Sequence, residues 1–146
     1  MSKYANGVFT PKNPQKYIGK YPIKYRSSWE ISLMSFLDSN DLPNILGWSS
    51  ESISIPYRNP LTGHWSMYIP DFLVIYMDKN SQKHCDMIEI KPEKEMPGFA
   101  GKVTSRTKLI QTINAAKWQA AIAYCVKRGW CFRVMCERDL FSFKRK

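Results

Sequence analysis

The sequence predicts an α/β fold in which two helices pack against a small mixed β-sheet. Its 146 residues are 44 % hydrophobic and 14 % aromatic, which supports one core, and the chain is too short for two ordinary domains. Helical periodicity and strand-like alternation occupy separate segments, in the order helix, strand, strand, strand, helix, strand. Because the last strand follows a long helix, we expect it to join the sheet through a crossover.

The first 26 residues are basic and lack an apolar period. Pro11, Pro14 and Pro22 interrupt this stretch. We therefore predict an extended basic arm over residues 1–26, followed by one domain over residues 27–146.

A helix is predicted at the start of the domain, over residues 27–40. Leu33 and Leu37 recur at helical spacing. Ser27 and Glu30 have the spacing of a capping box, in which the serine hydroxyl and the glutamate carboxylate satisfy free amides at the helix start. Glu30 therefore has a structural explanation as well as a functional one.

Three strands are predicted next, from alternating apolar residues and the turns between them. The first covers residues 48–57 and the second residues 64–76, and the turn at 59–63 joins them as a hairpin. The third covers residues 84–91 and ends at Pro92, which has no N–H to donate.

The longest helix is predicted over residues 105–128, with Gly129 as its C-terminal stop. Its expected buried stripe is Leu109, Ile113, Ala116, Ala120 and Ala123. The last strand is predicted over residues 130–136. We assign the five tryptophans to the core rather than to base stacking: Trp29, Trp48, Trp65, Trp118 and Trp130.

The net charge of +10 is unevenly distributed along the chain. Residues 1–29 hold six basic residues and residues 96–136 hold seven, with no acid in either segment. Ten of the twelve acidic residues lie between residues 30 and 95. Basic flanks suit a polyanion, because each phosphate that they neutralise releases counterions. The alternative is a charged surface that only keeps the protein in solution.

The four cysteines are expected to be reduced, because they have no Cys-x-x-Cys spacing and no secretory signal precedes them. They are Cys85, Cys125, Cys131 and Cys136. A zinc site formed by Cys131 and Cys136 with His64 or His84 is a weaker alternative. No apolar stretch approaches the roughly 20 residues of a membrane span, so no membrane partner is expected.

Two carboxylates and a lysine are expected to converge at one end of the sheet. Glu89 and Lys91 share a face of the third strand, while Ile88 and Ile90 point to the opposite, apolar layer. Asp71, inside the second strand, can meet this pair if the two strands are neighbours. Desolvating two carboxylates is costly without a cation, and hard oxygen ligands suit Mg²⁺.

These residues resemble the active-site pattern of the PD-(D/E)xK nuclease superfamily. The motifs are Arg26-Ser-Ser-Trp-Glu30, Pro70-Asp71-Phe72 and Glu89-x-Lys91, in that order. The arrangement is similar to that of phage junction-resolving endonucleases and TnsA-type transposase endonucleases. A fuller similarity, to head-completion nucleases of contractile-tailed phages, runs from Phe9-Thr-Pro-Lys through Ile88-Glu-Ile-Lys-Pro to Arg128-Gly-Trp.

The resemblance implies a restriction-endonuclease-like core and an endonuclease that cuts double-stranded DNA with Mg²⁺, for which Mn²⁺ substitutes. Asp71 and Glu89 would hold the metal together with the Ile90 carbonyl, and Glu30 would complete the shell directly or through water. Lys91 would orient the attacking water. The resemblance also implies action on packaged DNA ends before tail attachment, with head or neck proteins as partners, in the host cytoplasm or in the virion.

Several basic residues are expected to contact DNA. They are Lys12, Lys16, Lys20, Arg26, Lys102, Arg106 and Lys117. Lys117 is either a phosphate contact or an exposed helical lysine. Glu51 is either an outer-shell metal ligand or a group bonded to nearby backbone, and the second is favoured.

Two other functions share these features. A Holliday-junction resolvase or homing-type endonuclease would use the same residues on branched or specific sites. A DNA-binding neck or structural protein would keep the fold without catalysis, but the intact set of Glu30, Asp71, Glu89 and Lys91 argues against it.

Overall fold

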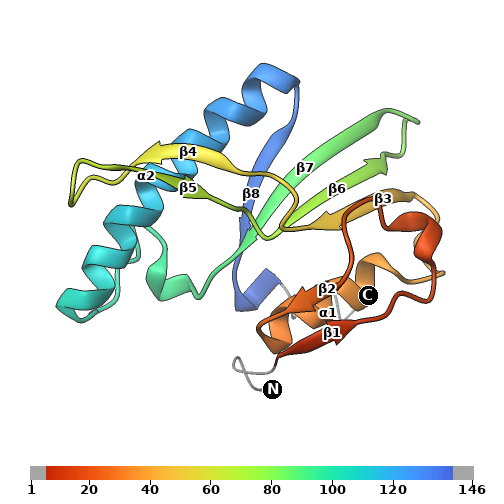
Figure 1. Ribbon diagram of the computed structural model, residues 1–146, viewed down its shortest axis with the longest axis horizontal. Coiled ribbons are helices and arrows are strands. Elements are labelled where there is room, and N and C mark those ends of the chain that lie inside the picture. Colours follow the sequence, from red (N-terminus) through yellow and green to blue (C-terminus); the bar gives the residue numbers. More distant parts are fainter. Residues whose placement is uncertain (1–5, 140–146) are drawn as a thin grey trace.

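The structure is a computed structural model that describes residues 6–139. Figure 1 shows its helices and strands. In chain order they are β1 (Gly7–Phe9), η1 (Pro14–Lys16), β2 (Ile23–Tyr25), α1 (Ser28–Leu37), β3 (Ile45–Ser50), β4 (Ile55–Arg58), β5 (Trp65–Tyr68), β6 (Phe72–Met77), β7 (Lys83–Ile90), η2 (Glu93–Glu95), α2 (Ser105–Arg128) and β8 (Cys131–Met135).

A four-stranded mixed sheet lies at the centre, in the order β3-β6-β7-β8. The first three strands are antiparallel, and β8 runs parallel to β7 after the crossover through α2. This confirms the α/β class, the mixed sheet and the crossover. The helix over residues 105–128 is also confirmed, and it stops at Gly129, whose φ of 71° is left-handed.

The predicted long hairpin is divided into two sheets. The strand expected over 48–57 breaks at Glu51, where φ is 51°, and the strand expected over 64–76 breaks around Pro70. The outer halves, β4 and β5, pair only with each other and extend over α2 (Figure 1). At the break, the Glu51 N–H donates to the Asp71 carbonyl at 3.0 Å. Asp71 was predicted to lie inside a strand. It lies instead at a bend between β5 and β6.

The predicted N-terminal arm packs against the rest of the protein over the described residues 7–25. Strand β1 pairs with β2, and Tyr17 forms a bridge with Trp48 of the central sheet. Tyr17 and Ile23 are buried in the same cluster as residues of α1. Tight turns around proline replace any regular period here, so the sequence pattern does not reveal the packing.

Two hydrophobic clusters cover opposite faces of the central sheet. On one face, α1 and the β1-β2 pair pack through residues such as Leu33 and Met34 against Phe72 and Ile88. On the other face, α2 and the β4-β5 hairpin pack over Met87. The molecule therefore has three layers with the sheet in the middle (Figure 1).

The buried face of α2 matches the predicted stripe in part. Ile113, Ala116 and Ala120 are partly buried and pack against the cluster that contains Trp118. Leu109 is 50 % exposed and Ala123 is also exposed. The fully buried residues of α2 are Asn114, Trp118, Ala121 and Cys125. Asn114 lies on this face because its Nδ2 donates to the Glu95 carbonyl at 3.0 Å, a contact that a pattern of apolar residues does not predict.

The prediction that all five tryptophans belong to the core is wrong for Trp65. Trp48 and Trp118 are buried, whereas Trp65 is 70 % exposed. It lies on the face of β5 that points away from α2, beyond the reach of either hydrophobic cluster.

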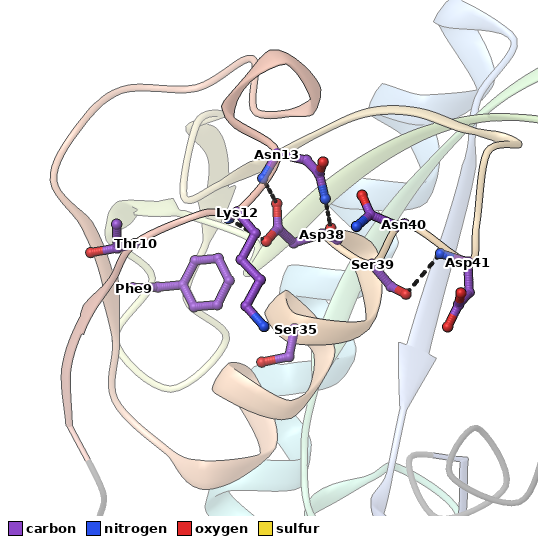
Figure 2. Close-up of a pocket in the computed structure, with 9 residues that line it drawn as sticks. All are labelled: Phe9, Thr10, Lys12, Asn13, Ser35, Asp38, Ser39, Asn40 and Asp41. Carbon is purple, nitrogen blue, oxygen red and sulfur yellow. Dashed lines mark hydrogen bonds between the residues drawn. The ribbon is translucent and has the colours of Figure 1, made fainter.

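A polar cavity of about 330 Å³ lies between the N-terminal segment and the C-terminal end of α1 (Figure 2). Asp38 lies beside it, and its carboxylate accepts hydrogen bonds from the backbone N–H groups of Lys12 and Asn13 at 2.7 and 3.0 Å. These bonds attach the N-terminal segment to α1. No helix among residues 6–139 has the length and apolarity to cross a bilayer.

Candidate active site

Asp71 and Glu89 meet where the bend after β5 faces the end of β7. The Asp71 N–H donates to Glu89 Oε1 at 3.2 Å, and the Ile90 N–H donates to Asp71 Oδ2 at 2.8 Å. Each carboxylate is thus oriented by a backbone amide of the other strand. The predicted meeting of these two residues is confirmed, as is the placement of Ile88 and Ile90 in the opposite apolar cluster.

The charges of this carboxylate pair are poorly compensated. Burial raises the pKa of Asp71 well above its usual range, and the neighbouring Glu89 raises it further. Burial likewise raises the pKa of Glu89, which is only 4 % exposed, although Lys91 acts in the opposite direction. Two acidic groups with raised pKa values at one point are typical of a functional site.

Lys91 lies beside this pair, directly after β7. Its Nζ is 3.7 Å from Glu89 Oε2, and its backbone N–H donates to the Met135 carbonyl at 3.0 Å. The parallel strand β8 therefore fixes the backbone from which the ammonium group extends. As predicted, Glu89 and Lys91 project toward the same region.

Lys117 also extends from α2 to this region. Its Nζ lies 5.8 and 5.7 Å from the ring centres of Tyr57 and Tyr68, within cation–π range. Burial and the positive charge of Lys91 lower the pKa of Lys117, whereas Glu89 raises it. Lys117 is thus not an exposed helical lysine, which was one of the two interpretations that the sequence left open.

Tyr68 is a member of this site that the sequence did not single out. Its hydroxyl is buried and makes no hydrogen bond of normal geometry with the described residues. Burial and the nearby Glu89 carboxylate raise its pKa. The sequence feature that could have indicated Tyr68 is its position three residues before Asp71. In the structure it is the one buried residue of β5.

Glu30 has the capping geometry that its spacing predicts. Its backbone N–H donates to Ser27 Oγ at 3.1 Å, and its carboxylate accepts from that hydroxyl and from the Arg26 N–H. The Glu30 charge also raises the pKa of Asp71, so the two carboxylates lie within electrostatic range. The structural and the functional readings of Glu30 are therefore compatible.

Glu51 pairs with a basic side chain, and its role as an outer-shell metal ligand stays a prediction. Its carboxylate forms an ion pair with the Arg26 guanidinium rather than bonding to neighbouring backbone. The contact joins the start of α1 to the break after β3, where the left-handed φ of Glu51 turns the chain. Arg26 is 67 % exposed along its side chain, so one of its faces remains open to solvent.

The donor set formed by Asp71 and Glu89 fits a hard divalent cation. Both side chains offer oxygen ligands. Among residues 6–139, the only ion pair between them and a cation is the 3.7 Å contact of Glu89 with Lys91, and the hydroxyl of Tyr68 has no hydrogen-bond partner. A bound cation would offset the desolvation that raises both pKa values, and its water ligands would supply hydrogen-bond partners.

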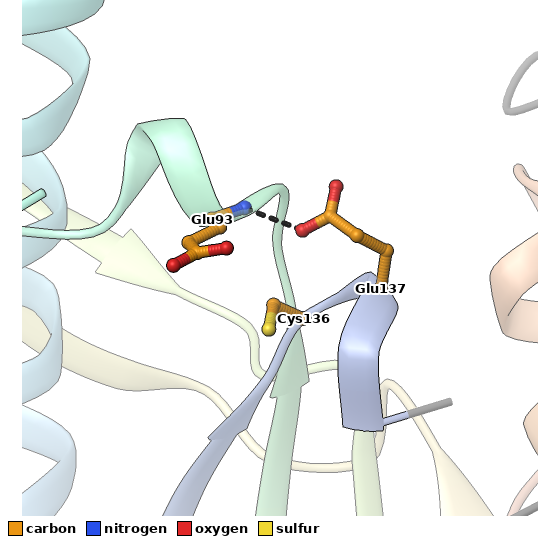
Figure 3. A group of neighbouring side chains, drawn as sticks. All are labelled: Glu93, Cys136 and Glu137. Carbon is orange, nitrogen blue, oxygen red and sulfur yellow. Dashed lines mark hydrogen bonds between the residues drawn. The ribbon is translucent and has the colours of Figure 1, made fainter. Parts of the chain in front are cut away.

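Two other possible metal sites are less suitable. Ligand atoms of Glu93, Cys136 and Glu137 lie within 4.8 Å of one another (Figure 3), but Glu137 accepts the Glu93 N–H and Glu93 pairs with Arg138 at 3.1 Å. The alternative zinc site is wrong, because Cys131 and Cys136 lie at opposite ends of β8, about 16 Å apart along a strand. All four cysteines are free thiols, as expected.

The basic residues expected to contact DNA occupy different environments. The ammonium group of Lys16 is hydrogen-bonded within the protein, since its Nζ donates to the carbonyls of Ser39 and Leu42 at 2.8 and 2.9 Å. The side chain of Lys12 borders the cavity in Figure 2. The remaining ones outside the site, Lys20, Lys102 and Arg106, are exposed.

Comparison with known proteins agrees with this geometry. Residues 42–137 match the family described as TnsA-like endonuclease N terminal. The chain is also 37 % identical, over 145 aligned positions, to the head completion nuclease of Enterobacteria phage T4. That alignment covers 92 % of this chain and 93 % of the relative.

The family match spans Asp71, Glu89, Lys91 and Lys117, and the longer alignment covers most of the chain. The resemblance noted in the sequence motifs is confirmed: the chain belongs to the TnsA-like endonuclease N-terminal family of PD-(D/E)xK-type nucleases.

Proposed function

We propose that this protein is a Mg²⁺-dependent endonuclease that hydrolyses phosphodiester bonds in double-stranded DNA. The observation that supports this most directly is the meeting of the buried Glu89 and half-buried Asp71 carboxylates, whose charges are poorly compensated, with two lysines. Membership of an endonuclease family supports hydrolysis of phosphodiester bonds as the reaction at this site.

Asp71 and Glu89 would hold the metal, with the Ile90 carbonyl and Glu30 as further ligands, and Mn²⁺ would replace Mg²⁺. When bound, the ion lowers the pKa of a water molecule and neutralises charge that develops on the phosphate. The backbone bonds that fix both carboxylates keep these ligands preorganised, so little reorganisation is needed before the ion binds.

The two lysines would act on the substrate. Lys91 would orient the attacking water and stabilise negative charge on the scissile phosphate, and its 3.7 Å contact with Glu89 supports this role. Lys117 approaches from α2 and would hold a phosphate oxygen, with the rings of Tyr57 and Tyr68 supporting its ammonium group. A half-buried ammonium interacts more strongly with a phosphate than one in water does.

The biological role proposed for this activity is phage head completion. The relative from phage T4 is described as a head completion nuclease, and the shared sequence extends over nearly all of both chains. The protein would act on packaged DNA ends before the tail attaches, in the host cytoplasm or with the virion. Head or neck proteins would then be its partners.

The test is cleavage of linear and of branched DNA with and without Mg²⁺. We expect the wild type to cut linear duplex only with the ion, and Asp71→Asn and Lys91→Ala to lose at least about 100-fold in rate. Matched controls are Asp41→Asn and Lys79→Ala, which alter an exposed aspartate and an exposed lysine away from the bend.

Full activity of both site variants would show that the proposed residues are not catalytic. Cleavage restricted to branched DNA would favour a junction resolvase instead. No cleavage of any DNA by the wild type, together with tight DNA binding, would favour a DNA-binding neck protein.

A further inference from the structure

The outer face of β5 is an apolar surface that neither hydrophobic cluster uses. Trp65, Met67 and Ile69 are 70 %, 56 % and 48 % exposed. Alternate residues of a strand share one face, so Trp65 and Met67 lie on the same side of β5, and Ile69 follows directly after the strand. We call this row of three residues the outer β5 face.

The opposite face of the hairpin that carries β5 packs against α2. Tyr57 and Tyr68 point the other way, belong to the cluster around α2, and lie under the Lys117 ammonium. The outer β5 face is therefore displayed on a supported element and not on a loose loop.

The hairpin that carries this face contains no acidic residue. Residues 52–70, which contain the whole hairpin, include no Asp or Glu. Arg58 lies directly opposite Trp65 in the β4-β5 register and is exposed. Its Nε donates to the Gly63 carbonyl at 3.0 Å, which anchors the guanidinium at the turn of the hairpin.

The face also leads directly into the candidate active site. Ile69 is two residues before Asp71, so at most about 7 Å of chain separates them, and at most about 20 Å of chain separates Trp65 from Asp71. The row from Trp65 to Ile69 is about 13 Å long.

We propose that the outer β5 face binds unpaired bases of the DNA substrate next to the phosphate that is cut. Duplex DNA stacks its base faces against one another, so only unpaired bases offer an apolar surface to Trp65 and Met67. Base–aromatic stacking tolerates any sequence, and Arg58 would bind the adjoining phosphate. The substrate is thus DNA that is frayed or single-stranded beside the cut, which extends the proposed nuclease function and depends on it.

Binding without cleavage tests this directly. Fluorescence anisotropy in EDTA would compare a labelled blunt duplex with the same duplex carrying a few non-complementary bases at one end. We expect the wild type to prefer the frayed DNA, and Trp65→Ala to weaken that binding by about 5- to 150-fold, the range for stacking one base on an aromatic ring. Binding of the blunt duplex should change little.

Two further variants control this experiment. Trp65→Phe keeps an aromatic surface and should restore most of the preference. Val126→Ala removes an apolar side chain of equal exposure, 70 %, from the end of α2, and should bind both DNAs like the wild type. Circular dichroism and thermal melting would verify that every variant is folded.

Equal binding of both DNAs by the wild type, or unchanged binding by Trp65→Ala, would overturn the inference. Sedimentation velocity measures the oligomeric state and tests the alternative that a second copy of the protein covers this face. A wild-type dimer that Trp65→Ala converts to a monomer would assign the face to that second copy. Mg²⁺-dependent cleavage by the wild type is measured separately, so a wild type that cleaves DNA but shows no preference for the frayed end would reject only the role of the outer β5 face.

Discussion

Asp71 and Glu89 are placed where ionised carboxylates are destabilised before any cation binds. Each accepts a backbone hydrogen bond from the other strand, yet burial and mutual repulsion raise both pKa values. The site therefore costs the metal-free fold some stability near neutral pH, and a divalent cation would recover it.

Replacing one charge should stabilise the metal-free protein. The folded state holds protons on this pair at pH values where the unfolded chain has lost them, so stability falls as pH rises from about 4 through the raised pKa values. Asp71→Asn removes one of the two ionising carboxylates and with it part of this loss of stability. It should raise the free energy of unfolding by about 1–3 kcal/mol at pH 7 in EDTA. Thermal melting from pH 4 to pH 8 measures the effect.

The gain of Asp71→Asn over the wild type should shrink toward pH 4, where both carboxylates of the wild type are protonated. Mg²⁺ should raise the melting temperature of the wild type and not of the variant. Asp41→Asn serves as the control, because Asp41 is exposed and should show neither effect. A variant gain that is equal at pH 4 and pH 8 would contradict the electrostatic explanation.

Lys117 should affect the rate more than the stability. Its ammonium contacts two aromatic rings and lies near Glu89, so removing it takes a positive charge from the place where the phosphate is expected. We expect Lys117→Ala to lower kcat/KM about 100-fold and Lys117→Arg to retain part of the activity. Lys108→Ala, an exposed lysine of the same helix, is the control, and steady-state cleavage kinetics provide the measurement.

At the scale of elements, the bend between β5 and β6 is the feature that creates the site. If the strand continued straight, Asp71 would belong to a regular ladder and the β4-β5 hairpin would not reach over α2. The left-handed backbone at Glu51 and the break around Pro70 let the outer halves of both strands turn together. The turn brings Tyr68 and Lys117 to the carboxylates.

The N-terminal segment is a structural element as well as a basic one. Ile23 is 1 % exposed and lies in the cluster that contains α1, so Ile23→Ala should lower the free energy of unfolding by about 2–4 kcal/mol through the cavity that it leaves. Ile18→Ala changes the same residue type at 53 % exposure and should cost less than about 0.5 kcal/mol. Urea denaturation compares them, and equal effects would mean that the segment is not packed.

At the scale of the whole molecule, basic segments of the chain flank the acidic site. The carboxylates of the site lie at one end of the central sheet, while exposed basic residues such as Lys20, Lys102 and Arg106 come from segments on both sides of it in the chain. Binding to DNA should therefore release counterions and weaken steeply with salt.

The salt dependence of DNA binding should distinguish exposed basic residues from a lysine that already bonds to the protein. Replacing both Lys102 and Arg106 by Ala should make the slope of log K against log salt shallower by about 2, one for each lost phosphate contact. Lys16→Ala should leave the slope unchanged, because its ammonium already binds two carbonyls. Anisotropy titrations at several NaCl concentrations measure both, and an unchanged slope for the double variant would exclude that surface.

Sequence reasoning succeeded where local rules are strong. Ser27 caps α1 and Gly129 ends α2, because each satisfies free backbone groups within its own turn. Alternation along β7 placed Glu89 opposite Ile88 and Ile90, and the motifs around Asp71 and Glu89 led to the correct nuclease family. These features depend on neighbours within a few residues.

The sequence by itself determined the mixed α/β class, the crossover and the pairing of Asp71 with Glu89. Only the tertiary structure decided that the N-terminal segment packs into the core, that Tyr68 and Lys117 join the carboxylates, and that Trp65 faces solvent. The physical reason is that periodicity records which face of an element is apolar. The bend of a sheet, and which distant side chains it brings together, depends on packing between segments that no local pattern encodes.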